Sequence, residues 1–315
     1  MNARSAGLVL GFAADRLFGD PRHLHPVAGF GQTAAALESR LYADNRARGS
    51  VYWLVLVGGT TSAGIAAERL TAQRPIARTL LTAVATWAVL GGRSLEREAL
   101  AVEELLGSDL VAARQRLTHL VGRRTEDLDE AEIARAVVES VAENTSDAVV
   151  SSLVWGGAFG IPGLVGHRAA NTLDAMVAHR SPRYERFGWA SARLDDLLNL
   201  PGSRLSAALA VVLGDDPKAA WTAWRRDAAR HPSPNAGPVE AAFAGALGIR
   251  LGGTNQYAGQ VEHRALMGDG RPPVRGDIGR ATVLAKRVGV GALTFAVGLR
   301  LRASFRRQSD ARICR

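Results

Sequence analysis

The stretch VYWLVLVGGTTSAGIAA, residues 51–67, decides the fold class of this 315-residue chain. It carries no charged side chain, and neither does a second stretch, AVVSSLVWGGAFGIPGLVG, which covers residues 148–166. A helix needs about 20 apolar residues to cross a bilayer, and both stretches come close to that length. The chain is therefore expected to place helices in a membrane.

Shorter apolar blocks extend this interpretation. Residues 79–92 reach the length of a span when Ile76 and Arg78 are included, because an arginine can extend its charged end to the membrane surface. We predict three spans, and up to six if the blocks 6–14, 205–214 and 288–299 also insert. Helix is expected nearly throughout, because Ala, Leu, Arg and Glu dominate and no run alternates with a period of two. The predicted fold is an all-α polytopic membrane helical bundle, with residues 1–315 as one integral-membrane domain and polar helical loops that carry the active site.

The charges are unevenly distributed along the chain. The formal net charge is +9, yet residues 93–147 hold 7 basic against 13 acidic residues, whereas residues 215–315 hold 17 against 8. We interpret 93–147 as an acidic polar helical segment and 215–280 as a polar loop segment of the same domain. A basic end suits the cytoplasmic flank of a membrane helix, where it meets anionic lipid. No zinc-ligand spacing and no alternation of aromatic and basic residues accompanies the charge, so nucleic-acid binding is not expected.

An acidic stripe lies on one predicted helix, which opens at an Asp129-Glu-Ala-Glu132 capping box. Glu139, Glu143 and Asp147 follow at helical spacing, and Asn144 adds a carboxamide of the kind that orients substrates. The plain interpretation is a solvated acidic face. The alternative is a metal–nucleotide site, because Mg²⁺ takes one or two carboxylates and leaves its other positions to water and phosphate.

Polar residues recur at helical spacing in two later segments. Asn171 and Asp174 are three residues apart, and Asp195 and Asn199 are four apart. Taken singly, such pairs are more often caps or exposed ion pairs worth under ~1 kcal/mol. Their concentration in one third of the chain favours a common site, whose further members are His167, Arg168, Arg193 and Asp196.

Two loops are candidates for contacts with an anion. His25, next to Pro26 and close to Arg22, either caps a helix or meets an anionic substrate at the membrane surface. Ser233 and Asn235 precede a predicted helix start, where backbone N–H groups without partners form an anion cradle unless the segment is a plain loop. The GGTNQY run at 252–257 is a second, shorter candidate for such an anion cradle.

Taken together, these motifs resemble the adenosylcobinamide-phosphate synthase family of cobalamin biosynthesis, the membrane amide ligases often called CobD/CbiB. The resemblance extends from about residue 15 to about residue 268. Two local departures are Pro201-Gly-Ser-Arg204, where Pro-Ala-Arg is typical, and Ser151-Ser-Leu153, where a proline is common. The motifs that carry the resemblance are 15–27, Arg124-Thr125, 139–147, 171–176, Tyr184 with Phe187-Gly188, 192–196 and 233–237.

The resemblance implies an ATP-dependent reaction. It would join a propionate of adenosylcobyric acid to the amine of (R)-1-aminopropan-2-ol O-phosphate, or a related amino-alcohol phosphate, to give adenosylcobinamide phosphate. ATP and Mg²⁺ are the expected cofactors. The protein is expected to be a multi-pass protein of the inner cell membrane, in contact with lipid, with its active site facing the cytoplasm. Homo-oligomerisation is left open.

The resemblance also suggests roles for single residues. Mg²⁺–ATP is expected on acidic side chains, the phosphates next to arginines, and one aspartate as base or second metal ligand. The catalytic set is Glu139, Glu143, Asn144, Asp174, Asp195 and Asp196; the metal ligands are Glu143, Asp147 and Asp174; and the cofactor-binding set is Arg168, Asn171, Arg193, His25, Ser233 and Asn235.

The resemblance constrains the topology as well. Motifs on both sides of block 148–166 should face one compartment, so the Gly156-Gly157 and Pro162-Gly163 pairs are expected to break it into a re-entrant or buried hairpin. A polytopic permease for a corrinoid or another anion is the alternative, and a membrane scaffold is a third. The acids lie in polar segments that flank apolar blocks, which suits a surface active site better than a transport path.

Overall fold

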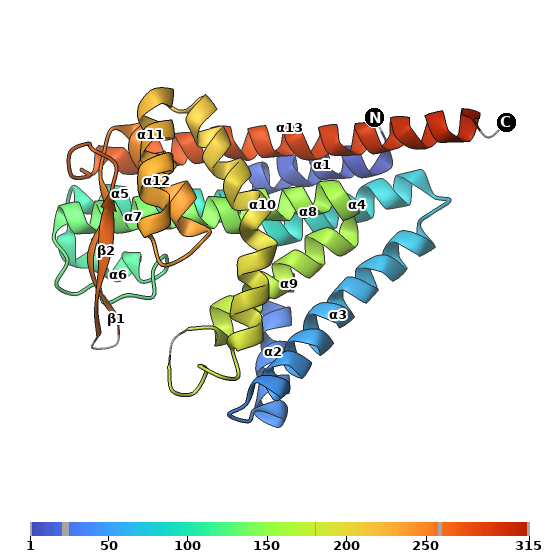
Figure 1. Ribbon diagram of the computed structural model, residues 1–315, viewed down its shortest axis with the longest axis horizontal. Coiled ribbons are helices and arrows are strands. Elements are labelled where there is room, and N and C mark those ends of the chain that lie inside the picture. The colour runs from blue at the N-terminus through green and yellow to red at the C-terminus, as the bar shows by residue number, and fades with distance from the viewer. Residues whose placement is uncertain (1, 21–24, 180, 258–259, 314–315) are drawn as a thin grey trace. The chain divides into compact units, whose positions relative to one another are not determined.

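The computed structural model describes residues 2–20, 25–179, 181–257 and 260–313 and is all-α in architecture (Figure 1). Within these residues, three helices are long and apolar enough to cross a membrane: Arg46–Leu70, Pro75–Leu106 and Gly276–Leu299. The prediction of an all-α polytopic membrane protein is confirmed. The spans differ in part from those expected, because the third contains block 288–299 and none contains block 148–166.

The chain divides into two compact units. Unit 1 comprises Met1–Gly91, Ser151–Asn199 and Ala292–Arg315, and unit 2 comprises Gly92–Val150 and Leu200–Gly291. The prediction that the chain acts as a single domain stays a prediction.

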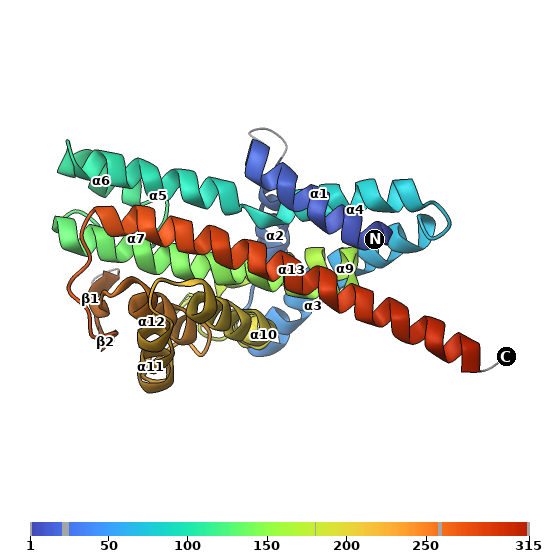
Figure 2. The same cartoon turned by 90° about the horizontal axis from the view of Figure 1, so that it is seen from above.

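Unit 1 is built on close contacts between helices, which small residues allow. Gly7 and Gly11 of α1 lie against α4, where a Cβ atom at either position would come within 2.4 Å of a threonine side chain. Figure 2 shows the two helices side by side. Such glycine-lined contacts are typical of helices packed in lipid. The elements of unit 1 are α1 Ala3–Phe18, α2 Pro26–Leu41, α3 Arg46–Leu70, α4 Pro75–Leu90, α8 Ser152–Phe159, α9 Ile161–Val177 and parts of α10 Trp189–Leu213 and α13 Gly276–Ile313.

Block 148–166 is broken, as predicted, but the break falls at Gly160, between the two predicted pairs, and Gly156 and Gly157 lie inside α8. The chain turns at Gly160, whose φ of 78° lies in the region that favours glycine, and α8 then packs against α9. Gly163 permits this contact, because a Cβ there would lie 2.1 Å from the carbonyl oxygen of Trp155. The placement of this hairpin relative to a membrane stays a prediction.

Unit 2 is organised around α7, Glu130–Asn144, which begins at the predicted capping box. Every residue from Ile133 to Ala142 is buried, since α5, α6, α12 and β1 pack around the helix. The other elements are α5 Gly92–Leu106, α6 Leu110–Leu117, the π-helical turn η1 Thr145–Ser151, α11 Pro217–Asp227, the 3₁₀ turn η2 Ala228–Arg230, α12 Ala236–Leu247, β1 Leu251–Tyr257, β2 Gln260–Met267 and the remaining parts of α10 and α13.

The hairpin of β1 and β2 corrects the sequence analysis, which expected helix nearly throughout and a polar loop over 215–280 (Figure 1). The strands are antiparallel, with an irregularity between Leu251 and Gly253. Gly252 and Gly253 have φ angles of 87° and 109°, which a non-glycine residue rarely adopts. The run 252–257, considered above as an anion cradle, is therefore mainly strand.

Candidate functional site

Within unit 1, α9 and α10 bring together a group of polar side chains that we call the α9–α10 cluster: His167, Asn171, Asp174, Asp195 and Asn199. The Nδ2 of Asn199 donates to Oδ2 of Asp195 at 2.8 Å, and Oδ1 of Asn199 lies 3.0 Å from Nε2 of His167. Asp174 is close enough to Asp195 to interact with its charge, and Asn171 hydrogen-bonds to the same carboxyl. The predicted grouping of the 171–174 and 195–199 motifs is present.

Asp195 is the group with the most unusual environment in this cluster. It is 7% exposed, and its Oδ1 is buried without a hydrogen bond in the described structure. Burial, followed by the charges of Asp174 and Asp196, raises its pKa to about 8, although Asn199 and Asn171 oppose the shift. At neutral pH the carboxyl therefore carries a proton in much of the population, which suits an acid–base role.

His167 is buried and neutral. Burial lowers its pKa to about 4, so the imidazole carries one hydrogen at pH 7. Because the partner of Nε2 is the amide oxygen of Asn199, we assign that hydrogen to Nε2, and Nδ1 then accepts from the hydroxyl of Ser152 at 3.2 Å. A chain of hydrogen bonds thus runs from Ser152 through His167 and Asn199 to Asp195. The sequence analysis gave Ser152 no role.

The two predicted arginines of unit 1 lie in different surroundings. Arg168 donates to Oδ1 of Asn171 at 3.3 Å and lines a largely apolar cavity of about 350 Å³ between α2, α3, α4 and α9. Arg193 is exposed, and its charge lowers the pKa of Asp196, which partial burial raises by more. Arg168 is thus tied to the cluster through Asn171, whereas Arg193 is near Asp196 at the surface.

Within unit 2, α7 and the hairpin form a second group, which we call the α7–hairpin cluster: Glu139 and Arg135 of α7, Arg123, and the backbone of Gly252 and Thr254. Glu139 is 2% exposed, and both of its oxygens are engaged by protein. Oε2 accepts from Nη2 of Arg123 at 2.6 Å, and Oε1 accepts from the backbone N–H of Gly252 at 2.9 Å. Arg135 lies 3.9 Å from Oε1 and also donates to the carbonyl of Thr254. In this structure Glu139 joins α7 to β1.

Glu143 lies one turn further along α7 and is exposed to solvent. The protein around its carboxylate still removes enough water to raise its pKa, while the charge of Arg264 opposes the shift. Among the predicted acids of unit 2, Glu143 is therefore the most exposed.

Glu240 of α12 is the functional candidate that the sequence analysis missed. It is fully buried, neither of its oxygens has a hydrogen-bond partner in the described structure, and burial raises its pKa well above the usual range. Oε1 lies 3.7 Å from Nε2 of His231, too far for a hydrogen bond. Buried polar groups without partners cost free energy, so such a group is often retained for function. The charges of Glu139, Glu143, Arg264 and Arg123 also act on it.

Asn144 and Asp147 lie where α7 gives way to the π-helical turn η1. The Nδ2 of Asn144 donates back to the carbonyl and the hydroxyl of Ser140, one turn earlier, at 2.9 and 3.1 Å. Asp147 is half-buried in η1. A π-helical turn within helix often marks a functional site, because it changes the direction in which side chains point.

In the loop before α12, the structure favours the plain loop considered above over an open anion cradle. The hydroxyl of Ser233 accepts from the backbone N–H groups of Asn235 and Ala236 at 3.2 and 3.1 Å, so the loop satisfies these donors itself. Arg204 donates to Oδ1 of Asn235 at 3.0 Å and to the carbonyl of Pro234 at 2.9 Å. Arg204, which had no role in the sequence analysis, therefore fixes the conformation of this loop.

His25 acts as a helix cap. Its Nδ1 accepts from the backbone N–H of Val27 at 3.1 Å at the start of α2, and its Nε2 lies 3.8 Å from Asp20. This is the capping role considered above, and a contact with substrate stays a prediction. Arg22 lies outside the described residues, as does Cys314.

Comparisons with known proteins show the family of this chain. The family model described as CobD/Cbib protein matches residues 8–285. The chain belongs to the CobD/CbiB family. It is 50% identical over 302 residues to the cobalamin biosynthesis protein CobD of Mycobacterium tuberculosis (strain ATCC 25618 / H37Rv), covering 94% of this chain and 96% of that protein. It is 42% identical over 290 residues to the protein of the same name from Chromobacterium violaceum, covering 89% and 91%. No solved structure matches it.

The predicted metal ligands of this CobD/CbiB chain fall into both units: Asp174 in unit 1, and Glu143 and Asp147 in unit 2. Among the residues that the structure describes, no three His, Cys, Asp or Glu side chains are placed to hold a metal ion. Magnesium bound with a nucleotide needs only one or two protein carboxylates. The two neighbouring carboxyls of Asp174 and Asp195, one with a buried oxygen that lacks a hydrogen bond, fit that requirement.

Proposed function

We propose that this chain is an ATP-dependent amide ligase that joins adenosylcobyric acid to (R)-1-aminopropan-2-ol O-phosphate or a related amino-alcohol phosphate, giving adenosylcobinamide phosphate. The observation that carries the proposal is the match over nearly the whole chain to relatives named cobalamin biosynthesis protein CobD. The α9–α10 cluster supports it with a titratable carboxyl suited to proton transfer.

The proposed reaction makes two demands on the protein. A carboxylate is a poor electrophile, so cleavage of ATP to ADP and phosphate must drive formation of the amide. The amine binds as an ammonium ion and must lose its protons before and during attack. A base whose pKa is near the working pH performs such a transfer best.

Asp195 is our candidate for that base. Its pKa of about 8 lies close to neutral pH, so the ionised fraction present at pH 7 would accept the proton, and Asn199, held in turn by His167, fixes the orientation of its carboxyl. Asn171 and Arg168 would position the reacting groups beside it, the guanidinium facing phosphate. His167, neutral and already hydrogen-bonded through both nitrogens, acts as a positioning residue in this scheme.

Bound Mg²⁺ would neutralise the phosphate charges of ATP, and in unit 1 Asp174 is the residue we expect to hold it. The like charge of Asp174 next to Asp195 is unfavourable without a proton or a cation between them, which supports this assignment. The roles of Glu143 and Asp147 as further ligands, and of Asp196 as an alternative base, remain part of the proposal.

One assay tests the reaction. Purified protein in detergent is incubated with ATP, Mg²⁺, adenosylcobyric acid and the amino-alcohol phosphate, and both ADP and the amide are followed by chromatography and mass spectrometry. We expect equal amounts of the two products from the unmodified protein and from a Glu185→Gln control, whose exposed acid lies between α9 and α10. Binding of the corrinoid without ADP or amide would reject the ligase and favour a permease.

A second experiment tests the proposed location in the inner membrane with a cytoplasmic site. Single cysteines replace the exposed residues Asp127 and Glu185 in a chain whose Cys314 is changed to Ser. A membrane-impermeant thiol reagent should label both positions from the cytoplasmic side only. Asp127 precedes the 139–147 motif and Glu185 follows the 171–176 motif. Labelling of the two positions from opposite sides of the membrane would contradict a cytoplasmic site that uses both of these motifs.

A further inference from the structure

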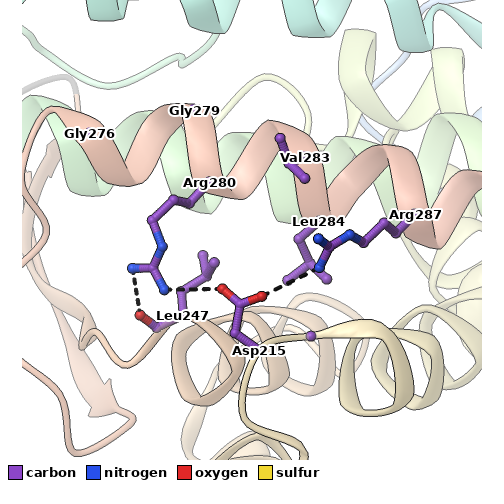
Figure 3. A pocket seen from close by; sticks show the side chains of 9 residues that line it. Asp215, Leu247, Gly276, Gly279, Arg280, Val283, Leu284 and Arg287 are labelled. Carbon is purple, nitrogen blue, oxygen red and sulfur yellow. Dashed lines mark hydrogen bonds and ion pairs between the residues drawn. The ribbon is translucent and has the colours of Figure 1, made fainter.

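A cavity of about 430 Å³ in unit 2 lies outside all the residues discussed above (Figure 3). One face of α13 forms a wall of it, with Arg280 and Arg287 among the lining residues, and Asp215 lines it from the segment after α10. The size is within the range of small-molecule sites. Gly276 leaves room at one side, since a Cβ there would meet no atom within 4 Å.

The two arginines of this cavity, which we call the Asp215 pocket, converge on one carboxylate. They are seven residues apart, so both lie on the same face of α13, separated by about 10 Å along its axis. Nη2 of Arg280 lies 3.3 Å from Oδ2 of Asp215, and Nη1 of Arg287 lies 3.4 Å from Oδ1. Figure 3 shows Asp215 between the two guanidinium groups.

Contacts with two helix ends fix the guanidinium groups in place. Nη1 of Arg280 donates to the carbonyl of Leu247, the last residue of α12, at 2.8 Å. Nη1 of Arg287 donates to the carbonyl of Leu213, the last residue of α10, at 3.1 Å. Positive groups held in advance lose little entropy when an anion binds, which favours binding.

The pocket has more positive than negative charge. The neighbouring ion-pair network contains Arg271, Arg280 and Arg287 against Asp215 and Asp277, which leaves one positive charge in excess. The two contacts of Asp215 are longer than the 2.7–2.9 Å typical of strong charge-assisted bonds. In the described structure, Nε and Nη2 of Arg287 have no protein partner, so its planar fork still offers donors.

We propose that the Asp215 pocket binds a phosphate group between Arg280 and Arg287, with Asp215 as the weaker carboxylate that the phosphate displaces. A phosphate carries more negative charge than a carboxylate and matches the arginine fork with two oxygens. Two sources have this chemistry. One is the head group of an anionic phospholipid, since the pocket lies along Gly276–Leu299, a candidate membrane span. The other is a free phosphate in solution.

The test compares two substitutions with opposite expected effects. Asp215→Asn removes the competing charge and keeps the shape, so phosphate affinity should rise several-fold. Arg287→Gln removes free donors and a charge, so affinity should fall about tenfold, which corresponds to about 1.4 kcal/mol. Arg280 is left unchanged because it also contacts Leu247 and Asp277. Arg225→Gln, at an exposed position on α11, is the matched control.

Two arms identify the source. In the first, inorganic phosphate is titrated against chloride at equal ionic strength, and binding is followed by the shift in Tm. In the second, native mass spectrometry counts the phosphatidylglycerol and phosphatidylcholine molecules that remain bound to the protein. Opposite responses of the two variants in the phosphatidylglycerol arm alone support a lipid site, and opposite responses with inorganic phosphate support a site for soluble phosphate. If both variants bind both probes as Arg225→Gln does, the proposal is wrong. Neither arm requires turnover, so the result is independent of the proposed ligase activity.

Discussion

The α9–α10 cluster and the α7–hairpin cluster begin from the same sequence pattern, acids and amides three or four residues apart on a helix, and end in opposite electrostatic states. Glu139 in unit 2 is bound by Arg123 and by the backbone of Gly252. Asp195 in unit 1 has an asparagine as its nearest partner and another carboxyl, that of Asp174, beside it. Spacing on a helix therefore does not decide what an acid does; the charge that faces it does.

This difference separates two kinds of carboxyl. The guanidinium of Arg123 lies against the carboxylate of Glu139, so this acid is a fixed structural link. The charge of Asp195 is offset by a proton that can leave near pH 8, so this acid can take part in proton transfer. The comparison predicts that substitutions in the α9–α10 cluster of unit 1 mainly lower the rate of the reaction. Substitutions at the arginine contacts of unit 2 should mainly lower the stability of the fold.

Asp195→Asn should have the largest effect. The amide keeps the hydrogen bond to Asn199 but cannot accept a proton from the amine, so the rate of amide formation should fall by about 10³-fold. The measurement is kcat for ADP and amide release in the coupled assay. Glu139→Gln, compared per folded molecule, should lose far less. An equal loss in the two variants would mean that Glu139 also acts in the reaction, and the comparison would fail.

The same variant carries its own folding control. Asp195 is protonated in the native state and ionised in the unfolded state between about pH 4 and pH 8, so the contribution of this group to stability falls as the pH rises through that window. Asp195→Asn should not show this fall, so its Tm should exceed that of the unmodified protein at pH 8. A lower Tm there would indicate that lost activity reflects misfolding.

Arg123→Met should have the next largest effect, this time on stability. The side chains of Arg123 and Glu139 are 5% and 3% exposed, and removal of one partner leaves the other charge buried. Such a change typically costs about 3–5 kcal/mol. Denaturant unfolding in detergent measures it. The double variant Arg123→Met with Glu139→Met should recover part of the loss, because the carboxylate that Arg123 neutralised is then gone, while Arg135 keeps its bonds to the carbonyls of Gly252 and Thr254. A double variant as unstable as the single one would contradict a role limited to this pair.

Much of this arrangement could be predicted from the sequence because it depends on local pattern. The uncharged block 51–67 became part of a candidate span, and the capping box at Asp129 starts α7. Pro162 lies in the first turn after the break in block 148–166, although the break itself is at Gly160. Helical spacing also predicted the grouping within α9 and α10. Each of these features is decided by residues within a few turns of one another.

What the sequence analysis missed depends on contacts between distant residues. The hairpin at 251–267 is tied to α7 by Glu139 and Arg135, more than a hundred residues away, and its strands show no clear alternation. Glu240 was not considered because nothing local shows that α12 is buried on every side. The N–H groups of the 233–236 loop looked available because the bond from Ser233 depends on how the loop turns.

The pH dependence of stability offers a smaller test. The pKa of His167 is about 4 in the folded protein and about 6.5 when unfolded, so the unfolded state binds more protons in this window. Stability is therefore lost as the pH falls from 6.5 to 4, by about 3 kcal/mol for this group. His167→Gln, which keeps a donor for Asn199, should flatten that part of the Tm profile. His119→Gln, an exposed histidine on unit 2, should leave it unchanged.

The smallest effect is expected for Asn144, at the end of α7, which can be compared with Asn171 of the α9–α10 cluster. Asn144 bonds only to Ser140 of its own helix in the described structure, and it is exposed. Asn144→Ala should therefore cost under about 1 kcal/mol of stability. Asn171 instead joins Arg168 to Asp195, so Asn171→Ala should raise the KM for the amino-alcohol phosphate and lower kcat. A kcat loss for Asn144→Ala that matches Asn171→Ala would show that η1 positions substrate as well, because the bond to Ser140 alone cannot produce it.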